Sequence, residues 1–520
     1  MTTDHALSSA ALREIPRRLA PTDISQFINL DQCRRFLRLR MHEKAGSAFL
    51  DDYGVHRQNI PPLLARSGSD FEKAVVAEIA ATYDTLDFAT ASRGRPQRTL
   101  QNERVVDLAR ALAPDATLVL LQPRVEARLG DWLIRGDIDV LKLWRDEADT
   151  LHVMIADIKS SPKAKVEHRL QVAFYHEVLT DLFATHGIEH APIEMGILFQ
   201  GPRHAGEDDD TLLAQREDAE RTFGVSIAAL DRPKDPESYL GSVRELVIGD
   251  QSTALNVAEM EFEAIPFHLT YKCDWCPYNE FCMKWSAEHD DLSLIPHLTE
   301  TEKSALRRHG ITTTNDLAHL KDLRREQVNG HSDIELDPAP GEKSRVRALA
   351  ATWPVGPRLD ELIHRARRYR RSKTKGVDCV TYIPSKGYGS LPYCDANQNP
   401  NLVRVYIDAQ HDYVQNRIYL LGALVVAAEH GIESSTRRRS IVRMTPGPPD
   451  AETEERLFVD WIGEVLRAIV ELAAPDEQGE ANAPIHLIFY NRFDQRLLLD
   501  GLGRHATTVL GATALYDFAT

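Results

Sequence analysis

The sequence contains no apolar run long enough to span a membrane, for which about 18 residues are needed. Its first twenty residues are polar and include Arg13, Arg17 and Arg18, so the apolar segment of a secretory signal is also absent. These two absences predict a cytoplasmic protein without membrane contact. The apolar content of 43% is typical of globular domains, and 520 residues are enough for two or three of them.

Cysteine is scarce: six residues in 520 are too few for a disulfide scaffold, and the cytosol would keep them reduced. Their placement is informative, because Cys273, Cys276 and Cys282 fall within ten residues and Cys33 lies about 240 residues upstream. Four soft thiolates suit either a [4Fe–4S] cluster or Zn²⁺, and the spacing alone does not separate the two. The same cysteines would also fit a core as small buried apolar side chains.

Positive charge is also in deficit, since the formal net charge is −16. This balance does not exclude a nucleic-acid-binding protein, because binding depends on local fields rather than on the total. The basic residues gather in two stretches, 34–44 and 365–375. Such a stretch is either a binding surface or a solvated face.

The pattern of apolar residues predicts five segments along the chain. They are a tail (1–21), a first α/β unit (22–290), a small helical module (291–375), a linker (376–400) and a second α/β unit (401–520). In the first unit, we expect helices near 71–79 and at 169–184, and strands at 117–122, 132–143, 151–157 and 194–200. In the second unit, we expect strands at 402–410, 417–428 and 484–491, and an amphipathic helix at 452–474.

A set of charged and amide side chains follows in order along the first unit. Asp137 ends an Arg-Gly-Asp segment, and Asp157 and Lys159 form an Asp-Ile-Lys triplet at the end of the next strand. A helix then carries Gln171 and Tyr175 one turn apart. Phosphodiester hydrolysis needs a divalent ion, and two carboxylates on neighbouring strands supply the oxygen ligands that Mg²⁺ prefers. Each residue alone could be a surface position, but the ordered set favours a site.

This ordered set resembles the PD-(D/E)xK nuclease superfamily, and within it the RecB-like and CRISPR-associated four-cysteine exonucleases. The resemblance covers roughly residues 22–285 and implies a restriction-endonuclease-like core that binds Mg²⁺ or Mn²⁺. Glu72, in the segment SGSDFEKAV, stands where many relatives have His. The resemblance therefore implies that Glu72 is a third metal ligand beside Asp137 and Asp157.

The resemblance also implies roles for the neighbouring residues. The backbone carbonyl of Ile158 would be a further metal ligand, and Lys159 would activate the attacking water. Gln171 and Tyr175 would contact DNA phosphates or position Lys159.

In the same nuclease group, one N-terminal and three C-terminal cysteines hold an iron–sulfur cluster. The resemblance therefore favours a [4Fe–4S] cluster over Zn²⁺ at Cys33, Cys273, Cys276 and Cys282. Ligation would close a loop of about 240 residues and pin the two ends of the domain together. A structural role is thus favoured over redox catalysis.

The downstream segments carry two further resemblances. Residues 292–320 resemble a helix-hairpin-helix element, which binds phosphates through backbone amides; the alternative is a helical spacer. Residues 401–520 resemble ribonuclease-H-like exonucleases of the DEDD kind, which hold two metals with an Asp-x-Glu on the first strand. Here Gln410 replaces that Glu after Asp408, with Asp494 and Asp517 as later candidates, so we expect this domain to be inactive.

The expected protein is therefore an α/β chain with a PD-(D/E)xK core, a helical hairpin module and a ribonuclease-H-like domain whose sequence reads as truncated. The leading hypothesis is a metal-dependent deoxyribonuclease that acts on single strands or DNA ends in DNA repair or anti-phage defence. The rival hypothesis is a catalytically silent DNA-binding module of a helicase–nuclease assembly. The sequence has no Gly-x₄-Gly-Lys-Ser/Thr phosphate loop, so a helicase would act in trans or from a missing C-terminal region.

Overall fold

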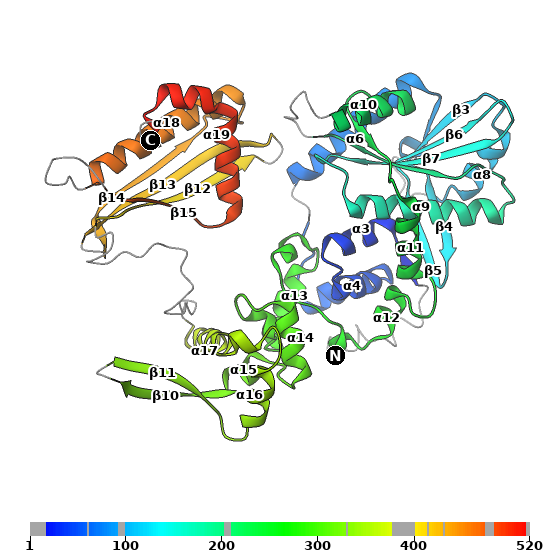
Figure 1. Ribbon diagram of the computed structural model, residues 1–520. Coiled ribbons are helices and arrows are strands. Elements are labelled where there is room, and N and C mark those ends of the chain that lie inside the picture. The colour runs from blue at the N-terminus through cyan, green and yellow to red at the C-terminus, as the bar shows by residue number, and fades with distance from the viewer. Residues whose placement is uncertain are drawn as a thin grey trace. The chain divides into compact units, whose positions relative to one another are not determined.

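A computed structural model describes residues 17–59, 62–91, 99–201, 210–328, 331–376, 401–412, 415–429, 432–473 and 483–515. Two compact units, Met1–Tyr382 and Ile383–Thr520, make up the chain (Figure 1). Most of the expected tail and linker, together with Asp517, lie outside the described residues. None of the helices in the described part of the chain is long and apolar enough to cross a membrane.

The first unit is built around a six-stranded mixed sheet in the order β2-β3-β6-β7-β8-β9. Its strands are β2 (Thr85–Asp87), β3 (Thr117–Leu121), β6 (Val140–Arg145), β7 (Leu151–Lys159), β8 (Glu194–Phe199) and β9 (Ala229–Asp231). The central strand β7 is antiparallel to β6 and parallel to β8. β7 is buried along most of its length, as expected for a strand with both faces covered.

Two helices cover opposite faces of this sheet, because side chains alternate along each strand. Ala156 of β7 belongs to the same apolar core as the inner face of α6 (Pro62–Thr82). Its neighbour Ile155 belongs to the other core, together with the inner face of α9 (Val166–Thr185). Both helices, and strands β3, β7 and β8, agree with the segments expected from the sequence.

The expected strand 132–143 is wrong as a single element. Its two halves are β5, which lies in a separate three-stranded sheet, and β6. That sheet has the order β1-β5-β4 and consists of β1 (Arg18–Leu19), β5 (Trp132–Asp137) and β4 (Arg124–Leu129). The backbone N–H of Ile138 donates to Pro123 O at 3.1 Å and the Ile138 side chain is fully buried. The apolar alternation therefore continues across a break that only the pairing of the strands reveals.

The N-terminal helices pack against a segment more than 200 residues later. They are α3 (Pro21–Asn29), α4 (Arg34–Lys44) and α5 (Phe49–Tyr53), and their partners are η2 (Tyr271–Trp275) and α13 (Asn279–Glu288). The ring of Phe49 lies edge-on to that of Phe281, with 5.4 Å between centroids. The other helices around the sheets are α7 (Phe88–Ala91), α8 (Asn102–Ala111), α10 (Asp210–Phe223), α11 (Pro236–Val247), α12 (Thr253–Glu259) and η1 (Phe262–Ala264).

Residues 291–375 form a small module with its own apolar core around Leu306, Leu317 and Leu362. Its elements are η3 (Leu292–Leu294), α14 (Glu300–Arg308), α15 (Thr314–Ala318), β10 (Lys321–Val328), β11 (His331–Pro338), α16 (Lys343–Ala350), η4 (Gly356–Arg358) and α17 (Leu359–Lys375). The expectation of a purely helical module is wrong, because β10 and β11 pair as an antiparallel hairpin. Their sequences are rich in charged residues, so no apolar alternation marked them as strands.

The second unit has a four-stranded sheet in the order β14-β13-β12-β15. Its elements are β12 (Val403–Asp412), β13 (Arg417–Glu429), β14 (Ile432–Met444), α18 (Ala451–Leu472), β15 (Ile485–Phe489) and α19 (Arg492–Ala512). β12, β13 and β14 are antiparallel neighbours, whereas β15 is parallel to β12. The exposed, arginine-rich β14 was missed in the sequence. Helices α18 and α19 approach closely at Gly501, where a Cβ would overlap the ring of Phe458.

Candidate active site and cysteine cluster

The end of β7 places a carboxylate and an amine in direct contact inside the first unit. Asp157 is almost fully buried, and its Oδ2 lies 2.7 Å from Nζ of Lys159. The side-chain amide of Gln171, on α9, donates to Asp157 Oδ1 at 2.8 Å. Three of the residues expected from the sequence therefore meet at one point.

A second carboxylate beside Asp157 belongs to Asp139, which sequence reasoning missed. Its Oδ2 accepts the backbone N–H of Ile158 at 2.9 Å. The position follows from the antiparallel pairing of β6 and β7, in which Val140 lies opposite Ala156, so the residue before β6 lies beside the end of β7. The sequence Gly-Asp-Ile-Asp contains two aspartates, Asp137 and Asp139. Asp137 is the last residue of β5, whereas Asp139 lies between β5 and β6.

Asp137 lies in the same cleft but is held by other groups. Its carboxylate accepts two hydrogen bonds from Arg124, at 2.6 Å and 2.9 Å. Its backbone carbonyl accepts the hydroxyl of Tyr175 at 2.5 Å. Gly136 is needed for this contact, because a Cβ there would lie 2.7 Å from the ring of Tyr175. Tyr175 therefore holds the end of β5.

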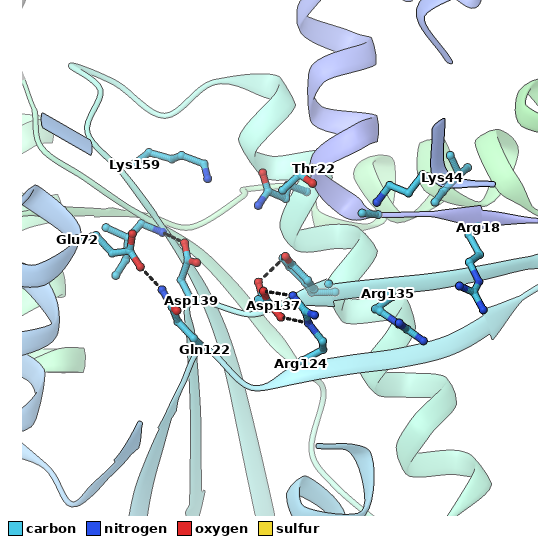
Figure 2. A pocket seen from close by; sticks show the side chains of 16 residues that line it. Arg18, Thr22, Lys44, Glu72, Gln122, Arg124, Arg135, Asp137, Asp139 and Lys159 are labelled. Carbon is cyan, nitrogen blue, oxygen red and sulfur yellow. Dashed lines mark hydrogen bonds and ion pairs between the residues drawn. The ribbon is translucent and has the colours of Figure 1, made fainter. Parts of the chain in front are cut away.

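Glu72 reaches the same cleft from α6 and accepts a hydrogen bond from the amide of Gln122. The cleft has a volume of about 550 Å³. Figure 2 shows Glu72, Asp139 and Lys159 on one side and basic side chains on the other. Those basic side chains are Arg18, Lys44, Arg124 and Arg135. The cleft thus joins an acidic pole to a basic wall.

The electrostatics of the acidic pole are unusual for a carboxylate site. Burial raises the pKa of Asp157 to about 7, and the charge of Asp139 adds to this effect while Lys159 opposes it. Burial alone would lower the pKa of Lys159, but the charges of Asp157 and Asp139 outweigh it and the pKa is raised. Lys159 is therefore protonated. Its single positive charge offsets only part of the negative charge that Asp157 and Asp139 carry when both are ionised.

The four cysteines expected to act together lie near one another. Cys33 precedes α4, Cys273 and Cys276 lie in and after η2, and Cys282 lies in α13. Burial raises the pKa of Cys276 to about 12 and also raises that of Cys282, and the charges of the other cysteines add to both shifts. Within the described ranges, however, no group of three or more His, Cys, Asp or Glu side chains is arranged to hold a metal ion.

Arg35 is buried beside these cysteines, although it belongs to the basic stretch that the sequence suggested as a binding surface. Its guanidinium stacks on Phe267, Trp285 and Phe262, at 3.5, 3.8 and 4.6 Å from the ring centroids. None of its three nitrogens has a hydrogen-bond partner among the described residues. Arg38 of the same stretch is fully buried too and donates to the carbonyls of Val257 and Ala258. Much of this stretch is therefore interior.

The turn between α14 and α15 does not offer its amides to a phosphate. The backbone N–H groups of Thr312 and Thr313 both donate to the carboxylate of Asp316, at 3.0 and 2.9 Å. The next two N–H groups, of Thr314 and Asn315, donate to Asp290. These protein acceptors occupy the donors that the resemblance to a helix-hairpin-helix element assigned to DNA.

In the second unit, two of the three candidate carboxylates lie near each other. Burial raises the pKa of Asp494, in the first turn of α19, and the charge of Asp408 adds to the shift. The amide of Gln410 donates to Asp408 at 3.3 Å. An amide here donates a hydrogen bond where the expected Glu would have supplied a ligand. Asp517 lies outside the described residues.

The comparison with known families agrees with the geometry of the first unit. The model of the PD-(D/E)XK nuclease superfamily matches residues 54–283, which include Glu72, Asp139, Asp157 and Lys159. The chain therefore carries a nuclease domain of this superfamily, whose members hydrolyse nucleic acids and generally use Mg²⁺ or Mn²⁺. No curated protein matches the chain.

A solved structure described as "Crystal structure of SSO0001" is similar to the chain at 12% identity. The match covers 54% of this chain and 94% of that one, with a TM-score of 0.19. A likeness of this size supports no argument about the site.

Proposed function

We propose that this protein is a Mg²⁺- or Mn²⁺-dependent deoxyribonuclease that hydrolyses phosphodiester bonds on single strands or at DNA ends. The observation that carries the proposal is the cleft in which Glu72, Asp139 and Lys159 face a basic wall, with buried Asp157 in contact with Lys159. A nuclease needs both halves, because one must hold a cation and the other must hold the negatively charged backbone. A RecB-like origin, with a setting in repair or anti-phage defence and a helicase partner, is part of the proposal by analogy only.

We assign the metal to Asp139 and Asp157, with Glu72 and the carbonyl of Ile158 completing the set. Asp139 takes the place that the sequence suggested for Asp137, because Asp137 is already paired with Arg124. Carboxylate and carbonyl oxygens suit a hard cation, and burial and the charge of Asp139 leave Asp157 undercompensated. No three carboxylates of the described residues are already gathered around one position, so binding of the ion would have to bring Glu72 towards Asp139 and Asp157. A bound Mg²⁺ would offset the charge of the transition state and make water a better nucleophile near neutral pH.

The other residues act on the substrate or on the ligands. Protonated Lys159 donates to a phosphate oxygen or to the attacking water and so steadies developing negative charge. Gln171 fixes the orientation of the Asp157 carboxylate through its 2.8 Å hydrogen bond. Tyr175 holds the end of β5, and through it the chain that leads to Asp139. Gln171 and Tyr175 are thus positioning residues.

The basic wall would bind the phosphates on one side of the scissile bond. Arg18, Lys44 and Arg135 line the cleft opposite the acidic pole, with Lys44 paired to Asp23 and Arg135 to Glu126. Arg124 also lines it, and its ion pair with Asp137 reduces the charge that it offers to DNA. This distribution supports a substrate backbone that crosses from the wall to the carboxylates.

The experiment that tests this function is cleavage of end-labelled single- and double-stranded DNA with Mg²⁺ or Mn²⁺. Lys159→Ala and Asp139→Asn should abolish cleavage, whereas the matched variant Asp137→Asn should retain much of it. Cleavage that survives Lys159→Ala and Asp139→Asn would overturn the site. If Asp137→Asn abolishes cleavage and Asp139→Asn does not, Asp137 rather than Asp139 is the metal ligand. A wild type that binds DNA without cutting it under all conditions would favour the silent binding module.

We also propose that Cys33, Cys273, Cys276 and Cys282 hold one thiolate-ligated centre, a [4Fe–4S] cluster or, as the alternative, Zn²⁺. The support is Arg35, since a buried guanidinium without hydrogen-bond partners calls for a nearby negative charge. Four thiolates around either centre would carry that charge. The same centre would join the N-terminal helices to α13.

Metal analysis of the purified protein tests this assignment. Iron and sulfide with absorbance near roughly 400 nm would identify the cluster, and stoichiometric zinc in colourless protein would identify the alternative. Arg35→Met should lower the metal content, whereas Arg34→Met, one residue away and exposed, should not. The proposed centre would be overturned if the purified wild type holds no metal and the Cys33→Ser variant is as stable as that wild type.

For the second unit we propose a ribonuclease-H-like domain without nuclease activity. The sheet order β14-β13-β12-β15, with three antiparallel strands and a fourth parallel to the first, supports the fold. Gln410 in place of a carboxylate supports the loss of activity, because an amide is a poor ligand for a second metal. Residual cleavage by the Lys159→Ala variant that disappears in Asp408→Asn would contradict this assignment.

A further inference from the structure

A second groove of about 700 Å³ lies on the first unit, outside the catalytic cleft. We call it the aromatic groove; Gln26, Arg57, Gln58, Asn59, Asp274 and Trp275 line it. Its lining comes from α3, from the stretch after α5 and from residues 274–277 in and after η2, which lie more than 200 residues later in the chain. No role in metal binding or in the cleavage step has been assigned to any of these six residues.

One lining residue of the aromatic groove lies one helical turn from a lining residue of the catalytic cleft. Thr22 lines the cleft and Gln26 lines the groove, and both belong to α3 at a spacing of four residues, which puts them on the same face. A chain of ion pairs also connects the two hollows. Lys44 of the cleft pairs with Asp23, and Arg57 of the groove pairs with Glu43.

Arg40 completes this chain, because it pairs with both Asp23 and Glu43. The connection is therefore made of alternating charges held at fixed positions. A strand whose reacting phosphate lies in the cleft would reach the aromatic groove within a few nucleotides.

The indole of Trp275 borders the groove and is open to solvent. It is 61% exposed and ends the short helix η2, in which no residue is buried. The loop that carries it is anchored, since the Gln58 amide donates to Asp274 O at 2.5 Å and the Gln58 N–H donates to Pro277 O at 3.0 Å. An exposed indole on an anchored loop is a preformed stacking surface, because little side-chain freedom is lost on binding.

We propose that the aromatic groove binds an unpaired nucleobase of a single-stranded DNA substrate, with the base stacked on Trp275. Arg57 borders the groove and can share its charge between Glu43, with which it is paired, and an adjacent phosphate. The polar side chains of Gln26, Asn59 and Asp274 can meet base edges. The inference rests on the proposed nuclease function and names its substrate class. Bases in a duplex are already stacked on one another, so the groove selects single strands over double strands.

Binding in the absence of cleavage tests the proposal. The full chain carrying Lys159→Ala is titrated, in EDTA, into fluorescein-labelled dT₁₂ and into a labelled hairpin duplex of equal length. Adding Trp275→Ala should weaken dT₁₂ binding roughly 5- to 100-fold and leave duplex binding nearly unchanged. Trp275→Phe keeps an aromatic face and should restore most of the affinity.

Tyr271→Ala is the matched control, because Tyr271 lies on the same turn, is 77% exposed and does not line the groove. It should leave dT₁₂ binding unchanged. Unchanged affinity in Trp275→Ala, or equal losses in Trp275→Ala and Trp275→Phe, would overturn the stacking site.

Arg57→Gln provides a second route if Trp275→Ala does not fold. It should weaken dT₁₂ binding and reduce the slope of log affinity against log salt by less than about one, because Glu43 shares the charge of Arg57; an unchanged slope would overturn the groove. A wild type that binds dT₁₂ through Trp275 but cuts nothing would support the groove and overturn the proposed function. A wild type that cuts DNA, and whose dT₁₂ affinity does not depend on Trp275, would support the proposed function and overturn the groove.

Discussion

Each unit of this protein buries a carboxylate, and the two are compensated in opposite ways. Asp157 of the first unit contacts one lysine and one amide, and burial raises its pKa to about 7. Glu454 of the second unit is fully buried as well, yet its pKa is lowered to about 2.

The surroundings of Glu454 explain the difference. Burial alone would raise its pKa, but hydrogen bonds from Arg504, His505 and Arg417, and from the N–H of Ile418, outweigh burial. The partners of Glu454 therefore more than compensate the negative charge of its carboxylate. Those of Asp157 do not fully compensate its charge. Burial of an acid does not by itself indicate a site. An excess of uncompensated negative charge does, because it favours a cation.

The largest expected effect comes from removing the undercompensated acid. Asp157→Asn should reduce DNA cleavage by roughly 10³-fold or more, because the metal loses a central ligand while the shape of the side chain is kept. The same variant should unfold at an equal or higher temperature in EDTA, because the ionised form of Asp157 is disfavoured by burial. Cleavage assays and thermal unfolding of one preparation check both statements. A stable variant that still cuts DNA would break the comparison.

Removing the overcompensated acid should have the opposite outcome. Glu454→Ala leaves two arginines and a histidine around an empty position and should destabilise the second unit by about 3 to 5 kcal/mol. Cleavage by the first unit should be unaffected at temperatures where the second unit stays folded. The loss of stability is measured by unfolding in urea, with hydrogen exchange in α18 as the signal. Glu455→Ala, on the same helix and more exposed, serves as the control.

Gln171 tests how much of the catalytic effect depends on orientation alone. Gln171→Ala removes the hydrogen bond that holds Asp157 Oδ1 without removing any proposed ligand. Cleavage should fall by about 10- to 100-fold, and a higher Mn²⁺ concentration should restore part of it. Gln171→Glu, which adds a like charge beside Asp157, should be worse than Gln171→Ala. Equal activity in all three proteins would remove Gln171 from the positioning role.

The smallest expected effect is a pair of opposite pH dependences. The raised pKa of Asp157 means that its contribution to stability is present below about pH 4 and is lost as the pH rises towards 7 in metal-free protein. The lowered pKa of Glu454 means that its contribution is present above about pH 4.5 and is lost as the pH falls towards 2. Unfolding of Asp157→Asn and Glu454→Gln against the wild type across pH 2 to 8 should flatten one slope each.

The sequence indicated the mixed α/β core, the helices α6 and α9 and the Asp-Ile-Lys end of β7. These features depend on local alternation and helical periodicity, which a single sequence carries. Strands β10, β11 and β14 were missed because charged residues fill them, so their backbone pairing left no apolar pattern. The local sequence pattern could not distinguish Asp137 from Asp139. Buried Ile138 continues the apolar alternation across the point where β5 ends and the chain leads into β6.

By itself, the sequence determined that this chain carries the residues of a nuclease and a set of four separated cysteines. Only the tertiary structure decided which residues meet. It placed Asp139 beside Asp157 because β6 pairs with β7, and it enclosed Arg35 in aromatic rings because α4 packs on α13. Both outcomes depend on contacts between residues far apart in the chain, and the order of residues along a sequence does not encode such distances directly.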